Sequence, residues 1–148
     1  MTLQVELVVP EGEVWSGPAE LVIAKTLDGD IGVLTGHTPV LGILVEGSVV
    51  TIRPESGEDG GAAGGDLKAA VGGGFFAIAD DRVSILAHHA QLGREVDASG
   101  ARAALDKALQ DAQASPGRDG GAGEDGEPAD VRYYRALLRA AGEPDDRA

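Results

Sequence analysis

Apolar and polar residues alternate along most of the N-terminal part of the chain. Residues 3–9 show this most clearly, because every second side chain there is aliphatic. A period of two is that of a half-buried β-strand. The same pattern returns at residues 67–71, and Val14-Trp15, residues 21–24 and residues 48–53 are further β-type segments. The pattern predicts a domain built from short strands.

Glycines interrupt the alternation in the stretch GDIGVLTGHTPVLGILVEG, residues 29–47. Short apolar runs between them must be separated by sharp turns. Pro39 fixes its own φ and disfavours helix at the preceding residue, so Gly36 to Pro39 should form a rigid corner with a positive φ at Gly36. His37, inside the corner, could act as a base or ligand, or could satisfy backbone groups by hydrogen bonding. The second role is favoured, because no Ser, Cys or other His lies close by in the sequence.

From Asp97 onward the apolar period changes to that of a helix. Asp97 or Ser99 could cap a first helix. The apolar face of that helix consists of Ala101, Leu105, Ala108 and Ala112, and Ala104 and Leu109 widen it. Asp130 should cap a second helix that ends before Gly142. Residues 114–129, rich in Gly and acidic residues, connect the two. The pattern predicts an αα-hairpin.

Three arginines follow the second helix at helical spacing. Arg132, Arg135 and Arg139 stand at positions i, i+3 and i+7, so they share one face. We call them the arginine stripe. Such a stripe is either an ordinary solvated face or a binding surface, and the spacing alone does not choose between them.

The predicted fold is mainly β with an α appendage. An N-terminal β-sandwich of short antiparallel strands should occupy residues 1–94, and a C-terminal two-helix (αα) hairpin should occupy residues 95–148. With aromatic residues at only 3% of the chain, the expected bulky core members are Trp15, Phe75 and Phe76. Residues 54–66 carry no apolar periodicity and are expected to form a flexible hairpin tip.

Composition and charge exclude several classes of function. A net charge of −13 repels phosphate backbones, which argues against nucleic-acid binding. Cysteine is absent, no apolar run could span a bilayer, and the N-terminus resembles no signal peptide. Asp28-Gly29-Asp30 lacks the further ligands of a calcium loop, and adjacent His88-His89 would point to opposite faces of a strand. We therefore expect no cofactor, no metal and no catalytic machinery.

The central stretch resembles the signature of a known family. GDIGVLTGHTP, followed by apolar residues and another Gly, is similar to the Gly-acid-apolar-Gly and Gly-His-x-Pro blocks of epsilon subunits of F-type ATP synthases. Residues 9–17 and 71–87 agree with that family in order and spacing. The resemblance covers residues 3 to about 97, and the helical tail matches more loosely.

This resemblance implies a non-catalytic subunit of the proton-translocating bacterial ATP synthase. It would belong to the central stalk and link the gamma subunit to the c ring, with Asp30, Gly36 and His37 facing the c-ring subunits. The C-terminal helices would restrain ATP hydrolysis, with Arg132, Arg135 and Arg139 directed towards the alpha/beta catalytic head. The chain would then be a peripheral protein on the cytoplasmic face of the cell membrane, which it reaches only through the complex.

Two points remain open at this stage. Some epsilon subunits bind ATP through an apolar-Asp-x-x-Arg-Ala sequence, but here Gly100 stands where the Arg should be, and Arg102 is displaced by two positions. The alternative function is a stand-alone β-sandwich domain that binds a small anionic ligand at its Gly-rich turns. That reading predicts a soluble monomer, whereas the resemblance predicts co-purification with gamma.

Overall fold

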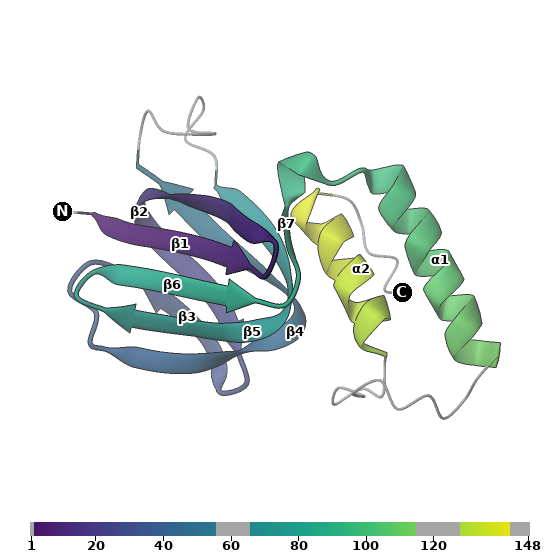
Figure 1. Ribbon diagram of the computed structural model, residues 1–148, viewed down its shortest axis with the longest axis horizontal. Helices are drawn as coiled ribbons and strands as arrows, with labels where there is room; N and C mark the ends of the chain where they lie inside the picture. Colours follow the sequence, from purple (N-terminus) through teal and green to yellow (C-terminus); the bar gives the residue numbers. More distant parts are fainter. Residues whose placement is uncertain (1, 56–65, 115–127, 143–148) are drawn as a thin grey trace.

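A computed structural model describes residues 2–55, 66–114 and 128–142 of the chain (Figure 1). Most of the expected hairpin tip at 54–66 and of the segment 114–129 lies outside these residues. In chain order the elements are β1 (Leu3–Val9), β2 (Gly12–Thr26), β3 (Gly29–Val33), β4 (Val40–Pro54), β5 (Leu67–Ala79), β6 (Arg82–Ala87), β7 (Ala90–Leu92), the 3-10 helix η2 (Gly93–Glu95), α1 (Ala98–Ala114) and α2 (Ala129–Ala140).

The seven strands form the predicted β-sandwich, which is closed like a flattened barrel. Hydrogen-bonded neighbours follow the order β1-β6-β5-β4-β2-β3, and β1 also pairs with β2, which closes the ring. All pairs are antiparallel except β1 with β6, and β7 adds to β5. Closure leaves few free edges, which protects a small β domain from pairing with other chains.

Strand β2 runs unbroken through Ser16 to Pro18 and so joins the two β-type segments expected at Val14-Trp15 and residues 21–24. The reason is a change of partner: up to Ala19, β2 pairs with β1, and from there it pairs with β4. A proline is tolerated at such a position, because its missing N–H removes little from either ladder. The Pro18 carbonyl accepts a hydrogen bond from the Glu55 N–H at 3.2 Å.

Strands β4 and β5 bend at glycines and continue beyond them. Gly47 in β4 has φ +74° and Gly73 in β5 has φ +84°, which only glycine adopts at low cost. The pairing register shifts between Glu46 and Ser48, as in a β-bulge. The Ser48 hydroxyl donates to the Val45 carbonyl at 2.6 Å and so supports the bend. The sharp turn expected at Gly47 is therefore a bend within a long strand.

The main hydrophobic core lies inside the sandwich and draws on residues from Leu3 to Leu92 only. Trp15 and Phe76 are buried in it as predicted. Phe75 is 51% exposed, so its expected place in the core is wrong. Neighbouring residues of a strand point to opposite faces, so only one of the two phenylalanines could face inward.

The helices form a second core beside the sandwich, and α2 lies between the sandwich and α1 (Figure 1). The predicted apolar face of α1 is confirmed for its buried members Ala101, Leu105 and Ala108. Ala70 of β5 belongs to the same cluster, and Val49 of β4 packs against it. The buried residues of α2 are Val131, Ala136, Leu137, Leu138 and Ala140. Since the sandwich covers α2 on one side and α1 covers it on another, α2 is buried more completely than a helix with a single apolar face.

The ends of α2 agree only in part with expectation. Pro128 occupies the N-cap position, so the expected cap at Asp130 is wrong. Asp130 lies in the first turn instead, where its carboxylate accepts from the Val131 N–H at 2.9 Å and complements the helix dipole. Gly142 ends the helix as predicted, with φ +85° and its N–H donating to the Arg139 carbonyl at 3.0 Å.

We predict that residues 1–94 fold without the helices, because the main core contains no residue beyond Leu92. A chain ending at residue 94 should show one cooperative thermal transition and a β-type circular dichroism spectrum. The full chain serves as the reference for the β signal. A molten or aggregated product would show that the helices are needed for the sandwich to fold.

Candidate functional site

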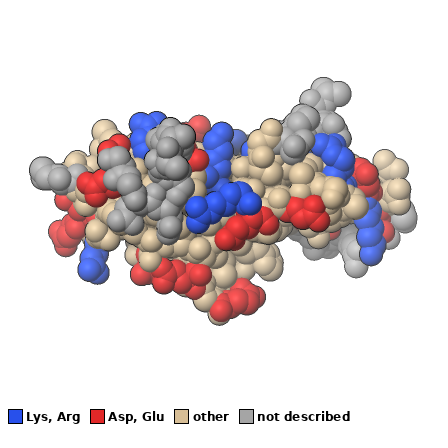
Figure 2. Space-filling model, turned by 90° about the horizontal axis from the view of Figure 1, so that it is seen from above, with Lys and Arg blue, Asp and Glu red and all other residues tan. Residues whose placement is uncertain are grey.

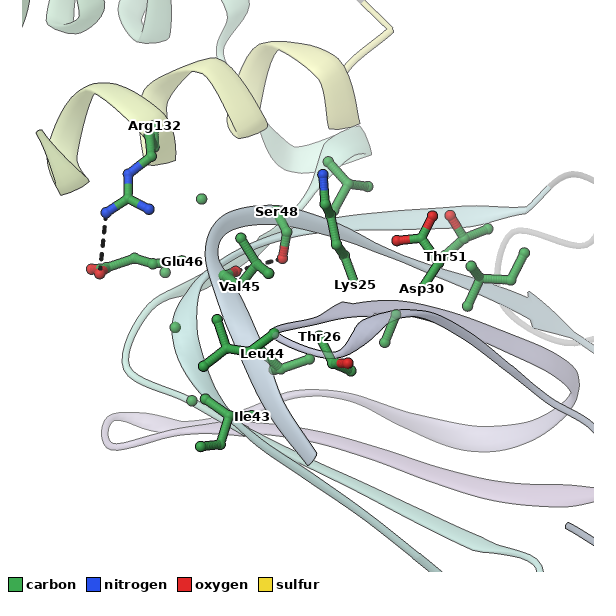
Figure 3. A pocket seen from close by; sticks show the side chains of 18 of the residues that line it. Lys25, Thr26, Asp30, Ile43, Leu44, Val45, Glu46, Ser48, Thr51 and Arg132 are labelled. Carbon is green, nitrogen blue, oxygen red and sulfur yellow. Dashed lines mark hydrogen bonds and ion pairs between the residues drawn. The ribbon is translucent and has the colours of Figure 1, made fainter. Parts of the chain in front are cut away.

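The arginine stripe lies along an open groove between α2 and the sandwich. The groove has a volume of about 1110 Å³ and is lined by residues of β2, β3, β4, β5 and α2 (Figure 3). Arg132, Arg135 and Arg139 line its helical side, and the bend at Gly47 lines the opposite side. The structure thus brings the three predicted arginines together at one site.

Two of these arginines contact the bend in β4. The Arg139 Nη2 donates to the Gly47 carbonyl at 2.9 Å. The Arg132 Nη2 lies 3.8 Å from the Glu46 Oε2, and the Arg132 side chain is only 16% exposed (Figure 3). An ordinary solvated face would leave such side chains in water. The interpretation of the stripe as a solvated face is therefore wrong for Arg132.

The groove is basic although the chain is strongly acidic. Lys25 of β2 and Lys68 of β5 join the three arginines in its lining, and Asp30 and Glu46 are its acidic members. Lysine and arginine side chains gather near the junction of sandwich and helices, with acidic side chains beside them (Figure 2). Basic and acidic side chains that are exposed to water attract each other only weakly. The arrangement suits binding of acidic groups.

The predicted corner is a rigid turn supported by the β5–β6 hairpin. Gly36 has φ +81°, as its place in a tight corner predicted, and its N–H donates to the Asp81 Oδ1 at 2.7 Å. The His37 Nδ1 lies 2.7 Å from the Thr38 carbonyl oxygen, which is a local backbone contact. His37 thus has the structural partner that the sequence favoured.

Asp30 does not join this corner. It lies at the start of β3, opposite Lys25 in the β2 pairing, and it lines the groove. Gly36 and His37 follow the far end of β3. The strand of five residues therefore separates the predicted c-ring residues into two places.

An apolar row crosses the outside of the sandwich. Ile43, Phe75 and Leu86 are direct neighbours in the β4–β5 and β5–β6 pairings, and each is 51% exposed. Leu41, two residues from Ile43 on the same face, is 76% exposed. These four residues are the apolar row. Contiguous exposed apolar side chains mark interaction surfaces more often than scattered ones do.

Other candidate chemistry is sparse in the part of the chain that the structure describes. His88 and His89 are both exposed, and the His89 ring lies 5.8 Å from that of Tyr133. Burial raises the pKa of the Tyr133 phenol, which keeps it neutral. Within residues 2–55, 66–114 and 128–142 there is no cluster of three metal-ligating side chains and no helix able to cross a membrane.

Apart from Asp30, sequence reasoning missed the sandwich side of the groove. Glu46 and Gly47 close the central glycine-rich stretch, but nothing local indicates that a helix far along the chain will contact them. Lys25 and Lys68 were missed for the same reason. The one available signal was the spacing of glycines up to Gly47, which marked backbone that turns sharply.

Comparison with known sequences shows that the chain is similar to chains of ATP synthases. Residues 2–93 match the family model described as ATP synthase, Delta/Epsilon chain, beta-sandwich domain. The ATP synthase epsilon chain of Thermobifida fusca is 49% identical over 111 residues, covering 74% of this chain and 77% of that protein. The corresponding protein of Streptomyces griseus is 48% identical over 137 residues, covering 93% and 97%.

Solved structures share the fold at low sequence identity. A chain of the Euglena gracilis mitochondrial ATP synthase, in a structure of its OSCP/F1/c-ring, superposes with a TM-score of 0.68 at 22% identity and covers 95% of this chain and 81% of that chain. A chain from the central stalk/c-ring structure of the Tetrahymena thermophila mitochondrial enzyme gives 0.55 at 19% identity, covering 90% and 94%. Both extend the likeness to the helices.

We predict that Gly36→Ala lowers the free energy of unfolding by about 1 kcal/mol, because an alanine is strained at this positive φ. No other atom lies within 4 Å of the added Cβ, so backbone strain is the whole effect. Gly32→Ala is the matched control, since Gly32 also has open space but no positive φ. Urea denaturation of both variants checks the difference, and equal stability of the two would contradict it.

Proposed function

This chain belongs to the family of ATP synthase epsilon chains, and we propose that it joins the gamma subunit to the c ring during rotary ATP synthesis. The single observation that carries the proposal is that similarity to the Streptomyces griseus epsilon chain spans 93% of this chain, and so includes both sandwich and helices. In this role the chain would be a non-catalytic subunit of the complex. Its place would be peripheral, on the cytoplasmic face of the membrane.

The apolar row is our candidate for the gamma contact. It is the largest set of exposed, adjacent apolar side chains on the described sandwich, and a partner would bury Leu41, Ile43, Phe75 and Leu86 together. For the c ring we retain the corner at Gly36 and His37, together with Asp30, as candidates. Because these residues occupy both ends of β3, a c-ring subunit would have to contact the whole length of that strand to reach all three.

The helices are our candidate for the regulation of hydrolysis. Arg132 and Arg139 are held by Glu46 and the Gly47 carbonyl when α2 lies against the sandwich. If α2 moves away, the same guanidinium groups become available to acidic segments of the catalytic alpha/beta head. The separate core of the helices makes such a movement possible without unfolding the sandwich.

A second candidate function is the binding of a small anionic ligand in the groove. The observation that favours it is the groove's lining, in which five Lys and Arg side chains face two acidic ones beside Gly47 and the Gly72–Gly74 bend. A chain that works in this way alone would stay a soluble monomer. Binding to gamma therefore separates the two candidates.

We predict that Phe75→Asp weakens binding of the chain to gamma by about 2 kcal/mol or more, because a charge would be placed in a buried apolar contact. Leu34→Asp is the control, since Leu34 is 60% exposed but lies outside the apolar row. Titration of purified gamma with each variant measures the affinity. If the wild-type chain does not bind gamma, the rotor role is wrong. If both variants bind gamma equally well, the rotor role stands but the apolar row is not the gamma contact.

We also predict that replacing Arg132, Arg135 and Arg139 together by alanine raises ATP hydrolysis by the assembled enzyme. Each exposed ion pair with the head would contribute about 0.2–1 kcal/mol, and the three together would hold the inhibited state. Inhibition should also weaken with added salt. The control is Arg102→Ala, which removes an arginine from α1.

A chain truncated at residue 96 gives the upper limit of activation. If truncation raises hydrolysis and the triple variant does not, the helices inhibit by apolar packing and the role given to the arginines is wrong. If neither raises hydrolysis, the inhibitory role does not hold for this chain.

A further inference from the structure

We propose that Gly47 and Gly93 form a docking platform for α2, and that this platform decides whether Arg132 and Arg139 stay bound to the sandwich. The two glycines come from different parts of the chain, the bend of β4 and the 3-10 helix η2. That the released arginines then bind the catalytic head rests on the function proposed above. The platform itself concerns only the chain's own contacts.

At Gly47 the backbone of α2 lies directly against the bend. A Cβ built on Gly47 would lie 2.5 Å from the Arg132 Cβ and 2.6 Å from the Arg132 carbonyl carbon. Such distances are well inside van der Waals contact, so any residue with a Cβ would force the helix or the bend to move. The absent side chain at Gly47 is what lets the first turn of α2 approach.

At Gly93 the other end of α2 makes an equivalent contact. A Cβ on Gly93 would collide with the Ala140 carbonyl oxygen in the last turn. Gly93 is fully enclosed, since it is the buried residue of η2. Arg132 and Ala140 lie near opposite ends of the 12-residue helix, so the two glycines fix its position at both ends.

The polar contacts depend on this close approach. Only with its backbone against Gly47 does α2 bring Arg139 within 2.9 Å of the Gly47 carbonyl. A guanidinium group that binds the sandwich is not available to an acidic partner at the same time. The sandwich therefore competes with any such partner for Arg132 and Arg139, and the fit at the two glycines sets the balance.

The two glycines can be tested separately, because a Cβ acts differently at each. Gly47→Ala adds backbone strain at φ +74° as well as the clash with α2. Gly93 has no positive φ, so Gly93→Ala acts through the clash with Ala140. Gly36→Ala adds strain at φ +81° with no clash and is the matched control.

The experiment is amide hydrogen exchange of the full-length chain and its three variants. We expect the amides of α2 to exchange about tenfold faster or more in Gly47→Ala and Gly93→Ala than in Gly36→Ala, since an undocked helix opens more often. Amides of β1, β2 and β6 report on the sandwich and should stay protected in Gly93→Ala. Equal α2 exchange in all three variants would overturn the platform.

Hydrolysis by the assembled enzyme then separates this inference from the proposed function. Gly93→Ala should lower the hydrolysis rate, because more of α2 is released towards the head. If exchange in α2 rises but hydrolysis stays the same, the platform holds and the inhibitory role of the helices is wrong. If neither changes, the platform is wrong.

Discussion

The left-handed backbone at Gly47 is the constraint on which the arrangement of this molecule depends. It lets β4 bend and continue as one strand of 15 residues. It also turns the Gly47 carbonyl towards Arg139 and leaves no side chain between the bend and the first turn of α2. Any other residue would be strained there and would collide with the helix. Strand geometry and helix docking thus share a single cause.

Helix α2 is held mainly by apolar contact, and the charges add little. Its buried residues face the sandwich on one side and α1 on the other, and burial of an aliphatic side chain is worth about 1.5–3 kcal/mol. The Arg132–Glu46 pair spans 3.8 Å, and the Glu46 side chain is 43% exposed, so it contributes a small fraction of that. The apolar side chains Val131, Leu137 and Leu138 therefore dominate the docking of α2.

The surfaces proposed for assembly lie mostly away from the helices, although Ile43 of the apolar row and Asp30 also line the groove beside α2. The apolar row crosses β4, β5 and β6 at Ile43, Phe75 and Leu86, and the corner at Gly36 lies beside the β5–β6 turn. The helices pack instead near the bends of β4 and β5 and against η2. Neither the row nor the corner is covered by α2, since the residues of the row are exposed with the helix in place. Movement of the helices would therefore leave Phe75, Leu86 and the corner at Gly36 untouched, whereas Ile43 and Asp30 line the groove and would lose its helical wall.

Local patterns in the sequence were enough to predict which regions form strands and which form helices, the corner and the family. Alternation indicated the strands, a positive φ at Gly36 followed from the corner, and helical spacing identified Ala101, Leu105 and Ala108. These features depend on residues close together in the chain. The motif GDIGVLTGHTP carried the family resemblance, and the match to residues 2–93 confirms it.

Only the tertiary structure determined which side chains of these local patterns are buried, where the strands bend, and which residues the arginines contact. Alternation states that Phe75 and Phe76 point in opposite directions, but only the layer packed against the strand determines which one is buried. A glycine permits a left-handed backbone, but hydrogen bonds from distant strands determine whether the chain turns back there or bends and continues, as at Gly47 and Gly73. The arginine stripe was visible in the sequence, whereas its partners Glu46 and Gly47 lie about ninety residues away, at a separation of 92 for Arg139 and Gly47. No local signal joins residues so far apart, because their contact exists only once the sandwich and the helices have packed together.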